Sequence, residues 1–173
     1  MYKYFANALI VNEGREEYGN ILVKANRIEA ISNDPLSDLP LDTEYIDCTG
    51  LIAIPGIIDA HVHFRQPGLE YKADMSSESK AALAGGVTTV LEMPNTNPTT
   101  TSEKSLEDKL KLANENMYCN YGFFFGLTNS NYSTAKTIAR DNCCGLKLFL
   151  GSSTGNMLVD DKSSLRELFS ITD

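Results

Sequence analysis

Both histidines of this 173-residue chain lie in one short stretch, IIDAHVHFRQPG, residues 57–68. If the stretch is a β-strand, side chains two positions apart share a face. His61 and His63 then point the same way. Asp59 precedes them on that face and Arg65 follows them, while the opposite face is apolar and suited to packing against helices. Two neutral imidazoles can bind one divalent metal such as zinc, and Asp59 could orient one of them. Because a zinc site needs at least three protein ligands, two ordinary histidines stay an alternative.

A single lysine interrupts a second apolar run, CGLKLFLG, residues 144–151. Its leucines share one parity, and Lys147 points to the other side. A lysine that points into the middle of a barrel is costly unless its charge is paired or removed. One interpretation is that CO₂ carboxylates the amine, which then bridges two metals as a carboxylate. The alternatives are a lysine that reaches solvent at the strand end, or one paired with Glu92.

Two further polar residues follow predicted strands and could bind an anionic group. Arg65 continues the histidine face, where its guanidinium could hold a carboxylate. Asn95, in EMPNTNP (residues 92–98), offers both a hydrogen-bond donor and an acceptor. The alternative for Arg65 is a surface ion pair, and for Asn95 a plain turn.

The composition is that of an ordinary globular protein, with 42% hydrophobic and 22% charged residues. A net charge of -8 argues against a nucleic-acid or anionic-membrane surface, so we expect neither partner. No apolar stretch approaches the roughly 20 residues of a membrane helix, and the start of the chain lacks the pattern of a signal peptide. The four cysteines are scattered, which is typical of reduced thiols. We therefore expect a cytoplasmic protein.

The elements that must position these residues fall into two parts, which predict a domain over 1–52 and another over 53–173. The first part has short β-branched runs separated by turn signals and a Pro-rich loop over 33–43, and it reads as an antiparallel β unit. The second part alternates strands and helices, which predicts parallel strands with right-handed crossovers. The predicted strands are 54–63, 87–93, 119–126 and 144–150. The predicted helices are 72–84, one that begins with a capping box of Thr100 and Glu103, 133–141 and 160–170.

Four such units fit either an open sheet or part of a barrel. Polar residues at the strand ends favour a barrel, where functional sites gather at the carboxyl ends of the strands. A complete (β/α)₈ barrel takes about 250 residues, but only about 120 follow the β unit here. We therefore expect an α/β fold that corresponds to the N-terminal half of a TIM-type barrel.

Three segments, PGIIDAHVHFRQPG, GGVTTVLEMPNTNP and GLKLFLGSSTGN, resemble the dihydroorotases, a family of the amidohydrolase superfamily. The resemblance covers essentially the whole chain, and it makes the N-terminal β unit part of a small β-sandwich domain. It implies a binuclear zinc site in which His61 and His63 bind the first metal and Lys147 is the N6-carboxylated bridge. It implies that Arg65 and Asn95 hold the substrate carboxylate. The implied reaction is the reversible, metal-dependent hydrolysis of the ring amide of dihydroorotate to carbamoyl aspartate in pyrimidine synthesis.

The sequence also departs from this family. It has no third histidine, and the family's catalytic aspartate would lie beyond residue 173. The expectation is therefore an N-terminal portion that is inactive alone. Two alternatives stay open: another cyclic amidase of the allantoinase or dihydropyrimidinase type, and an inactive dihydroorotase-like scaffold that binds a partner. The sequence leaves a homodimer open.

Overall fold

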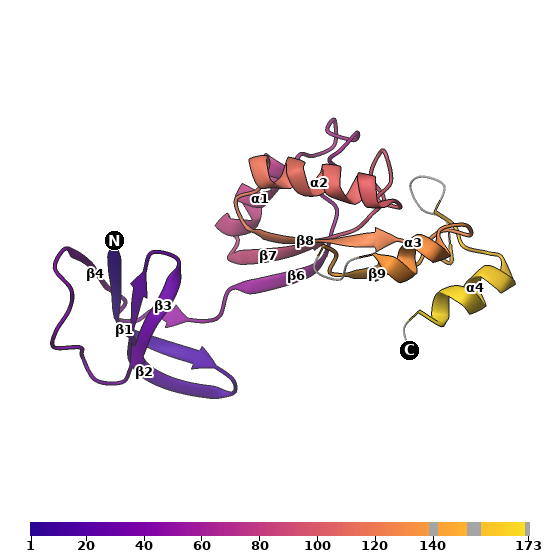
Figure 1. Ribbon diagram of the computed structural model, residues 1–173. Helices are drawn as coiled ribbons and strands as arrows, with labels where there is room; N and C mark the ends of the chain where they lie inside the picture. Colours follow the sequence, from indigo (N-terminus) through magenta and orange to yellow (C-terminus); the bar gives the residue numbers. More distant parts are fainter. Residues whose placement is uncertain (139–141, 152–156, 172–173) are drawn as a thin grey trace. The chain divides into compact units, whose positions relative to one another are not determined.

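The computed structural model describes residues 1–138, 142–151 and 157–171. It divides into two compact units, Met1–Pro55 and Gly56–Asp173 (Figure 1). None of the helices within the described ranges is long and apolar enough to cross a membrane.

The first unit is one five-stranded sheet. Its strands are β1 (Tyr2–Asn12), β2 (Arg15–Lys24), β3 (Arg27–Ser32), β4 (Thr43–Asp47) and β5 (Ile52–Ala53). The order is β3-β2-β1-β4, and β5 also pairs with β1. The hairpins are antiparallel as predicted, but β4 and β5 run parallel to β1. The prediction of a purely antiparallel unit is therefore wrong. The reason is that the loop before β4 carries the chain back to the start of β1, so both strands run in the same direction.

The second unit has four parallel strands in sequence order, β6 (Ile57–Val62), β7 (Val87–Glu92), β8 (Asn120–Gly126) and β9 (Gly145–Lys147). Its helices are α1 (Met75–Ala84), α2 (Glu103–Asn116), α3 (Tyr132–Thr137) and α4 (Lys162–Phe169). Four parallel β/α units in this order form the first half of a TIM-type barrel, so the predicted fold class is confirmed. Strand β9 is shorter than predicted, and Phe149 instead forms an isolated bridge with Leu158.

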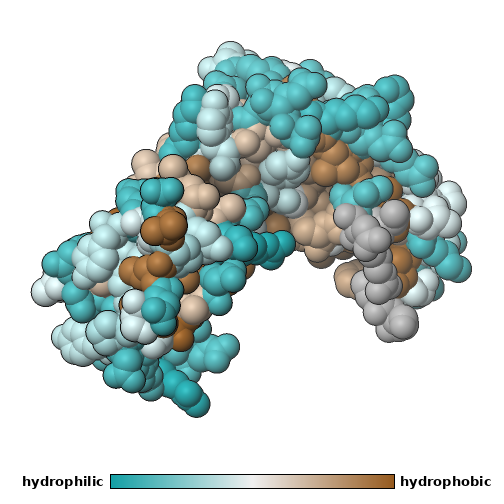
Figure 2. Space-filling model, turned by 60° about the vertical axis from the view of Figure 1, so that its left-hand side comes forward, coloured by the Kyte–Doolittle hydropathy of each residue, from teal (hydrophilic) through white to brown (hydrophobic). Residues whose placement is uncertain are grey.

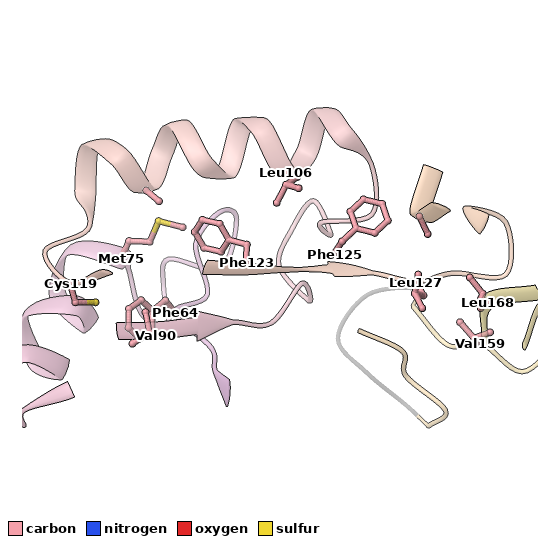
Figure 3. Packing of buried hydrophobic residues seen from close by; sticks show 12 residues of the cluster. Phe64, Met75, Val90, Leu106, Cys119, Phe123, Phe125, Leu127, Val159 and Leu168 are labelled. Atoms are coloured by element: carbon pink, nitrogen blue, oxygen red, sulfur yellow. The ribbon is translucent and has the colours of Figure 1, made fainter. Parts of the chain in front are cut away.

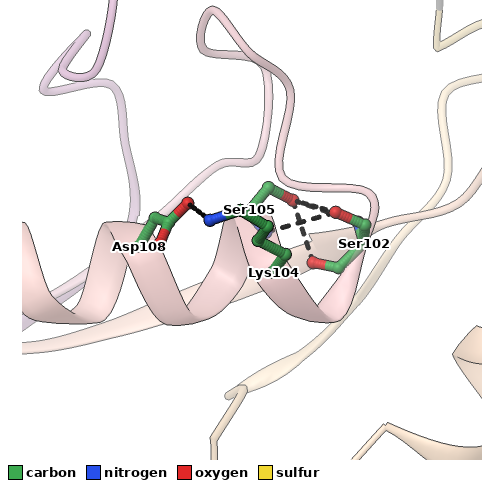
Figure 4. Close-up of polar contacts among 4 residues, drawn as sticks. All are labelled: Ser102, Lys104, Ser105 and Asp108. Atoms are coloured by element: carbon green, nitrogen blue, oxygen red, sulfur yellow. Dashed lines mark hydrogen bonds and ion pairs between the residues drawn. The ribbon is translucent and has the colours of Figure 1, made fainter.

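The start of α2 differs from the prediction in its capping residues. The capping box is formed by Ser102 and Ser105, each of which accepts from the other's backbone N–H, at 3.2 and 3.0 Å (Figure 4). Thr100 is buried, and its N–H donates to the carbonyl of Pro94. Because the helix begins at Glu103, Thr100 lies too early in the chain to be its cap. Of the predicted helix over 133–141, residues 139–141 lie outside the described ranges.

Helices α1 and α2 lie on one side of the sheet of the second unit (Figure 1). Their contacts with the strands form the main hydrophobic core (Figure 3), which includes Met75, Val90, Leu106, Phe123 and Phe125. Each of these five side chains is at most 1% exposed. Burial of this size stabilises by roughly 1.5–3 kcal/mol per large side chain. The core therefore fixes the strands whose carboxyl ends carry the polar residues.

Hydrophobic residues also reach the surface, where Figure 2 shows brown atoms among the teal polar ones. Ile57 and Ile58 of β6 are 46% and 64% exposed. Strand β6 lies at the edge of its sheet and pairs only with β7 among the described strands.

Candidate active site

The candidate site residues lie at the carboxyl ends of three of the four parallel strands. His63 and Arg65 follow β6, Asn95 follows β7, and Lys147 ends β9. Because parallel strands end at the same edge of a sheet, these residues belong to one rim of the second unit. This is the edge at which barrel enzymes place their chemistry.

The two imidazoles lie side by side, with ring centroids 5.4 Å apart and ring planes inclined by 55°. His61 is exposed and His63 is half-buried. The ladder between β6 and β7 has an irregularity between Asp59 and Val62, so the strict alternation of the strand is broken there. The rings nevertheless gather on one side of the strand.

The surroundings of His63 favour its neutral form. Burial lowers the pKa of its imidazole below the usual 6.5, and the charges of Arg65, His61 and Lys147 lower it further. The amide of Asn95 acts in the opposite direction and raises this pKa. Because its pKa is lowered, His63 is neutral at neutral pH. The neutral imidazole is the form that binds metal. The two cations are therefore near enough to act on His63.

Asn95 is 7% exposed, and its buried Oδ1 has no hydrogen-bond partner within the described part of the chain. It lies in a loop that packs tightly against the loop after β6. The N–H of Asn97 donates to the carbonyl of Pro67 at 3.0 Å. Gly68, with a φ of 82°, approaches the Asn97 backbone so closely that a side chain there would collide with it. The two loops thus form one rigid rim around Arg65 and Asn95.

Asp59 is exposed, and its Oδ1 accepts from the backbone N–H of His61 at 3.0 Å. The described contact is therefore with the main chain and not with an imidazole. The expected role of Asp59 in orienting an imidazole stays a prediction.

Lys147 is half-buried, and its Nζ lies over the ring of Phe149 at 5.2 Å. It does not pair with Glu92, so that alternative is wrong. The partner of Glu92 is Lys109, at 3.0 Å between Nζ and Oε2. Lys109 can pair with Glu92 because α2 lies over the sheet that contains β7 (Figure 1).

Lys109 was not identified from the sequence, although a signal was present. Leu106, Lys109 and Ala113 are the buried residues of α2. They are spaced by three and four positions, which places them on one face of a helix. A lysine on the apolar face of a helix requires a buried partner, and Glu92 at the end of a strand supplies it.

The donor groups allow a test of whether a metal would fit. Within the described ranges, no group of three or more His, Cys, Asp or Glu side chains is placed to hold one ion. The chain does supply two adjacent imidazoles, one of them held neutral, and nitrogen ligands of this kind suit zinc. A carboxylated Lys147 would add an oxygen ligand. The residues present therefore fit part of a zinc site.

Known proteins share parts of this sequence and fold. Residues 52–159 match the model described as "Amidohydrolase family". The chain is 36% identical over 152 residues to a dihydroorotase of Methanothermobacter thermautotrophicus, covering 88% of this chain and 32% of that protein. It is 38% identical over 137 residues to the multifunctional protein CAD of Squalus acanthias, covering 78% of this chain and 6% of that protein.

Among solved structures, the L-hydantoinase (dihydropyrimidinase) of Arthrobacter aurescens superposes with a TM-score of 0.88 at 28% identity. That match covers 96% of this chain and 37% of the hydantoinase. The chain thus spans about a third of the length of these single-enzyme relatives. Residues 52–159, which match the family model, include all of the candidate site residues and all four barrel strands. This chain belongs to the amidohydrolase family.

Proposed function

We propose that this chain serves a metal-dependent cyclic amidohydrolase of the dihydroorotase type, which reversibly hydrolyses the ring amide of (S)-dihydroorotate to N-carbamoyl-L-aspartate. The observation that carries the proposal is the position of Arg65, which follows His63 by two residues at the carboxyl end of β6 and whose charge lowers the pKa of the His63 imidazole. A guanidinium beside candidate metal ligands is suited to bind a substrate carboxylate. Dihydroorotate has a carboxylate, whereas dihydrouracil, allantoin and hydantoin lack one.

In this proposal Arg65 and Asn95 orient the substrate. The Arg65 guanidinium donates two parallel hydrogen bonds to the carboxylate. The Asn95 amide is buried and can both donate to the carboxylate and accept from a ring N–H. Together they fix one end of the substrate, so that its ring amide lies over the histidines.

His61 and His63 would hold a zinc ion, and Lys147 would join them after carboxylation. When bound, such an ion polarises the amide carbonyl and lowers the pKa of water. The burial and positive charges around His63 keep its imidazole available as a ligand. Because this chain has only two histidines, the remaining ligands that zinc requires would come from other groups.

The hydantoinase type is a second candidate, favoured by the similarity to the Arthrobacter aurescens structure. The two functions differ in the substrate carboxylate, and dihydrouracil is dihydroorotate without that group. We therefore propose calorimetric titration of the chain, in the presence of zinc, with dihydroorotate, dihydrouracil and allantoin.

We expect zinc to bind, and dihydroorotate to bind at least tenfold more tightly than dihydrouracil, since a charge-assisted bidentate pair is about twice as strong as a neutral hydrogen bond. Equal affinity for the two ligands would contradict the dihydroorotase type and favour the hydantoinase type. Failure to bind zinc or any of the ligands would contradict both and favour the partner-binding scaffold.

A further inference from the structure

Glu92 and Lys109 form an ion pair deep in the second unit. Glu92 ends β7 and Lys109 lies in the middle of α2, and their side chains are 2% and 0% exposed. Burial raises the pKa of the Glu92 carboxyl and lowers the pKa of the Lys109 amine, and each partner opposes the shift of the other. Taking two charges out of water is costly, and an apolar pair of similar size is often as stable or more so. Stabilisation of the fold therefore does not by itself explain why this buried pair is present.

The contacts of Glu92 lead to the loop that carries Arg65. Glu92 Oε1 accepts from the backbone N–H of Phe64 at 3.1 Å. The backbone N–H of Arg65 also acts on the carboxylate and stabilises its charge. Arg65 has a φ of 70°, a left-handed conformation that residues other than glycine rarely adopt. Such a conformation persists only where the surrounding contacts hold it, and the hydrogen bond from Phe64, the residue before Arg65, to Glu92 is one such contact.

The contacts of Lys109 lead to the loop that carries Asn95. Lys109 Nζ donates to the carbonyl of Met93 at 3.3 Å and lies over the ring of Phe123 at 4.8 Å. Met93 in turn donates its N–H to the carbonyl of Val62, the last residue of β6. One ion pair thus touches the backbone of both loops, immediately beside the two residues expected to bind the substrate.

We infer that the Glu92–Lys109 pair is a positioning device, which holds Arg65 and Asn95 in register with each other for binding of a carboxylate. Neither residue touches the substrate. Glu92 fixes the backbone at Phe64, the residue before Arg65, and Lys109 fixes Met93, two positions before Asn95. The inference rests on the proposed function for the identity of the ligand, but the fixing of the loops can be tested without any ligand.

The first test measures amide hydrogen exchange in the unaltered chain and in Glu92→Met, which removes the acceptor oxygen. In the unaltered chain, the Phe64 and Arg65 amides should be as protected as the Phe125 amide in β8. In Glu92→Met we expect their exchange to accelerate at least tenfold, while Phe125 changes less than twofold. Rapid exchange of both amides in the unaltered chain would overturn the inference, whatever the behaviour of any variant.

The second test separates positioning from a general effect on stability. The double variant Glu92→Met/Lys109→Met removes both buried charges and the acceptor oxygen, and it should recover most of the stability that either single variant loses. It should still bind dihydroorotate at least tenfold more weakly than the unaltered chain, with zinc affinity within threefold. If the double variant binds dihydroorotate normally, the pair is structural only and the inference fails.

The matched control is the exposed pair on the same helix, Lys104 and Asp108, 2.7 Å apart (Figure 4). Lys104→Met/Asp108→Asn should change neither exchange at Phe64 nor affinity for dihydroorotate. If the unaltered chain does not bind dihydroorotate, the proposed function fails, and amide exchange at Phe64 and Arg65 still decides whether the pair fixes the loop.

Discussion

Arg65 combines a left-handed backbone with a charge that acts on His63. The left-handed conformation interrupts the extended backbone shortly after β6, which ends at Val62. A lysine in its place would keep the charge but lose the planar fork that matches a carboxylate. Both the position and the residue type are therefore consistent with binding of an anionic group.

We predict that Arg65→Ala weakens binding of dihydroorotate by about thirty- to several-thousand-fold, because loss of a charged partner costs about 2–5 kcal/mol. Zinc affinity should stay near that of the unaltered chain, since Arg65 is not a proposed ligand. Calorimetry with each ligand in turn measures both effects. Arg65→Lys should restore part of the affinity. A variant that loses zinc but keeps dihydroorotate would show that Arg65 does not bind the carboxylate.

Lys147 gives a second test at this scale. If its amine is carboxylated, zinc should bind more tightly in bicarbonate buffer than in buffer purged of CO₂, by at least threefold. Lys147→Ala should show no such dependence, because it lacks the amine. Equal zinc affinity of the unaltered chain in the two buffers would leave Lys147 as the unmodified cation that lies over Phe149.

Among the elements, helix α4 depends on one carboxylate at its start. Asp161 accepts from the backbone N–H of Ser164 at 2.7 Å and from the hydroxyl of Ser163. These bonds lower the pKa of Asp161 to about 2. A lowered pKa means that the stabilisation is complete above the ordinary value of 3.8 and is lost as pH falls through the folded value.

We therefore predict that the first turn of α4 loosens as pH falls from about 4 to about 2. Amide chemical shifts of Ser164 should follow this titration. Asp161→Asn keeps the capping oxygen without the charge, so the same signal should be nearly independent of pH in that variant. A Ser164 signal that does not move below pH 4 in the unaltered chain would contradict the cap.

The contact between the two rim loops can be tested at Gly68. Gly68→Ala should destabilise the second unit by about 1–3 kcal/mol or more, because the residue has a positive φ and its new methyl group would meet the Asn97 carbonyl. Gly86→Ala is the matched control, since Gly86 has a φ of 86° but open space around it. Urea denaturation should give the larger loss for Gly68. Equal losses would show that the loops are not in close contact.

The sequence was most informative where structure is local. The sequence pattern located all four barrel strands. Alternation along β6 also predicted that both histidines lie on one side of that strand, since this depends only on neighbours two residues away. The parallel pairing of β1 with β4 was not predicted, because it depends on a return of the chain across more than thirty residues. The pair of Glu92 and Lys109 was also missed. The spacing of buried residues in α2 marks Lys109 as buried, but only the packing of the helix identifies Glu92 as its partner.

At the scale of the whole molecule, each unit has its own buried cluster. We predict that Phe125→Ala, which empties a fully buried site of the second unit, costs about 3–5 kcal/mol. Leu150→Ala, at a residue that is 66% exposed, should cost less than about 0.5 kcal/mol. Urea denaturation measures both. Because each unit has its own core, we expect amide exchange in Phe125→Ala to accelerate in β8 and not in β2. Equal acceleration in the two strands would contradict this expectation.

The outer side of β6 has a consequence for handling the protein. Its exposed Ile57 and Ile58 lie on a strand that pairs on one side only within the described residues. Free N–H and C=O groups beside apolar side chains are a template for adding further strands, which is how aggregates nucleate. Light scattering should therefore rise steeply with protein concentration and after freezing and thawing. Ile58→Lys, which places a charge on that edge, should delay this loss of colloidal stability.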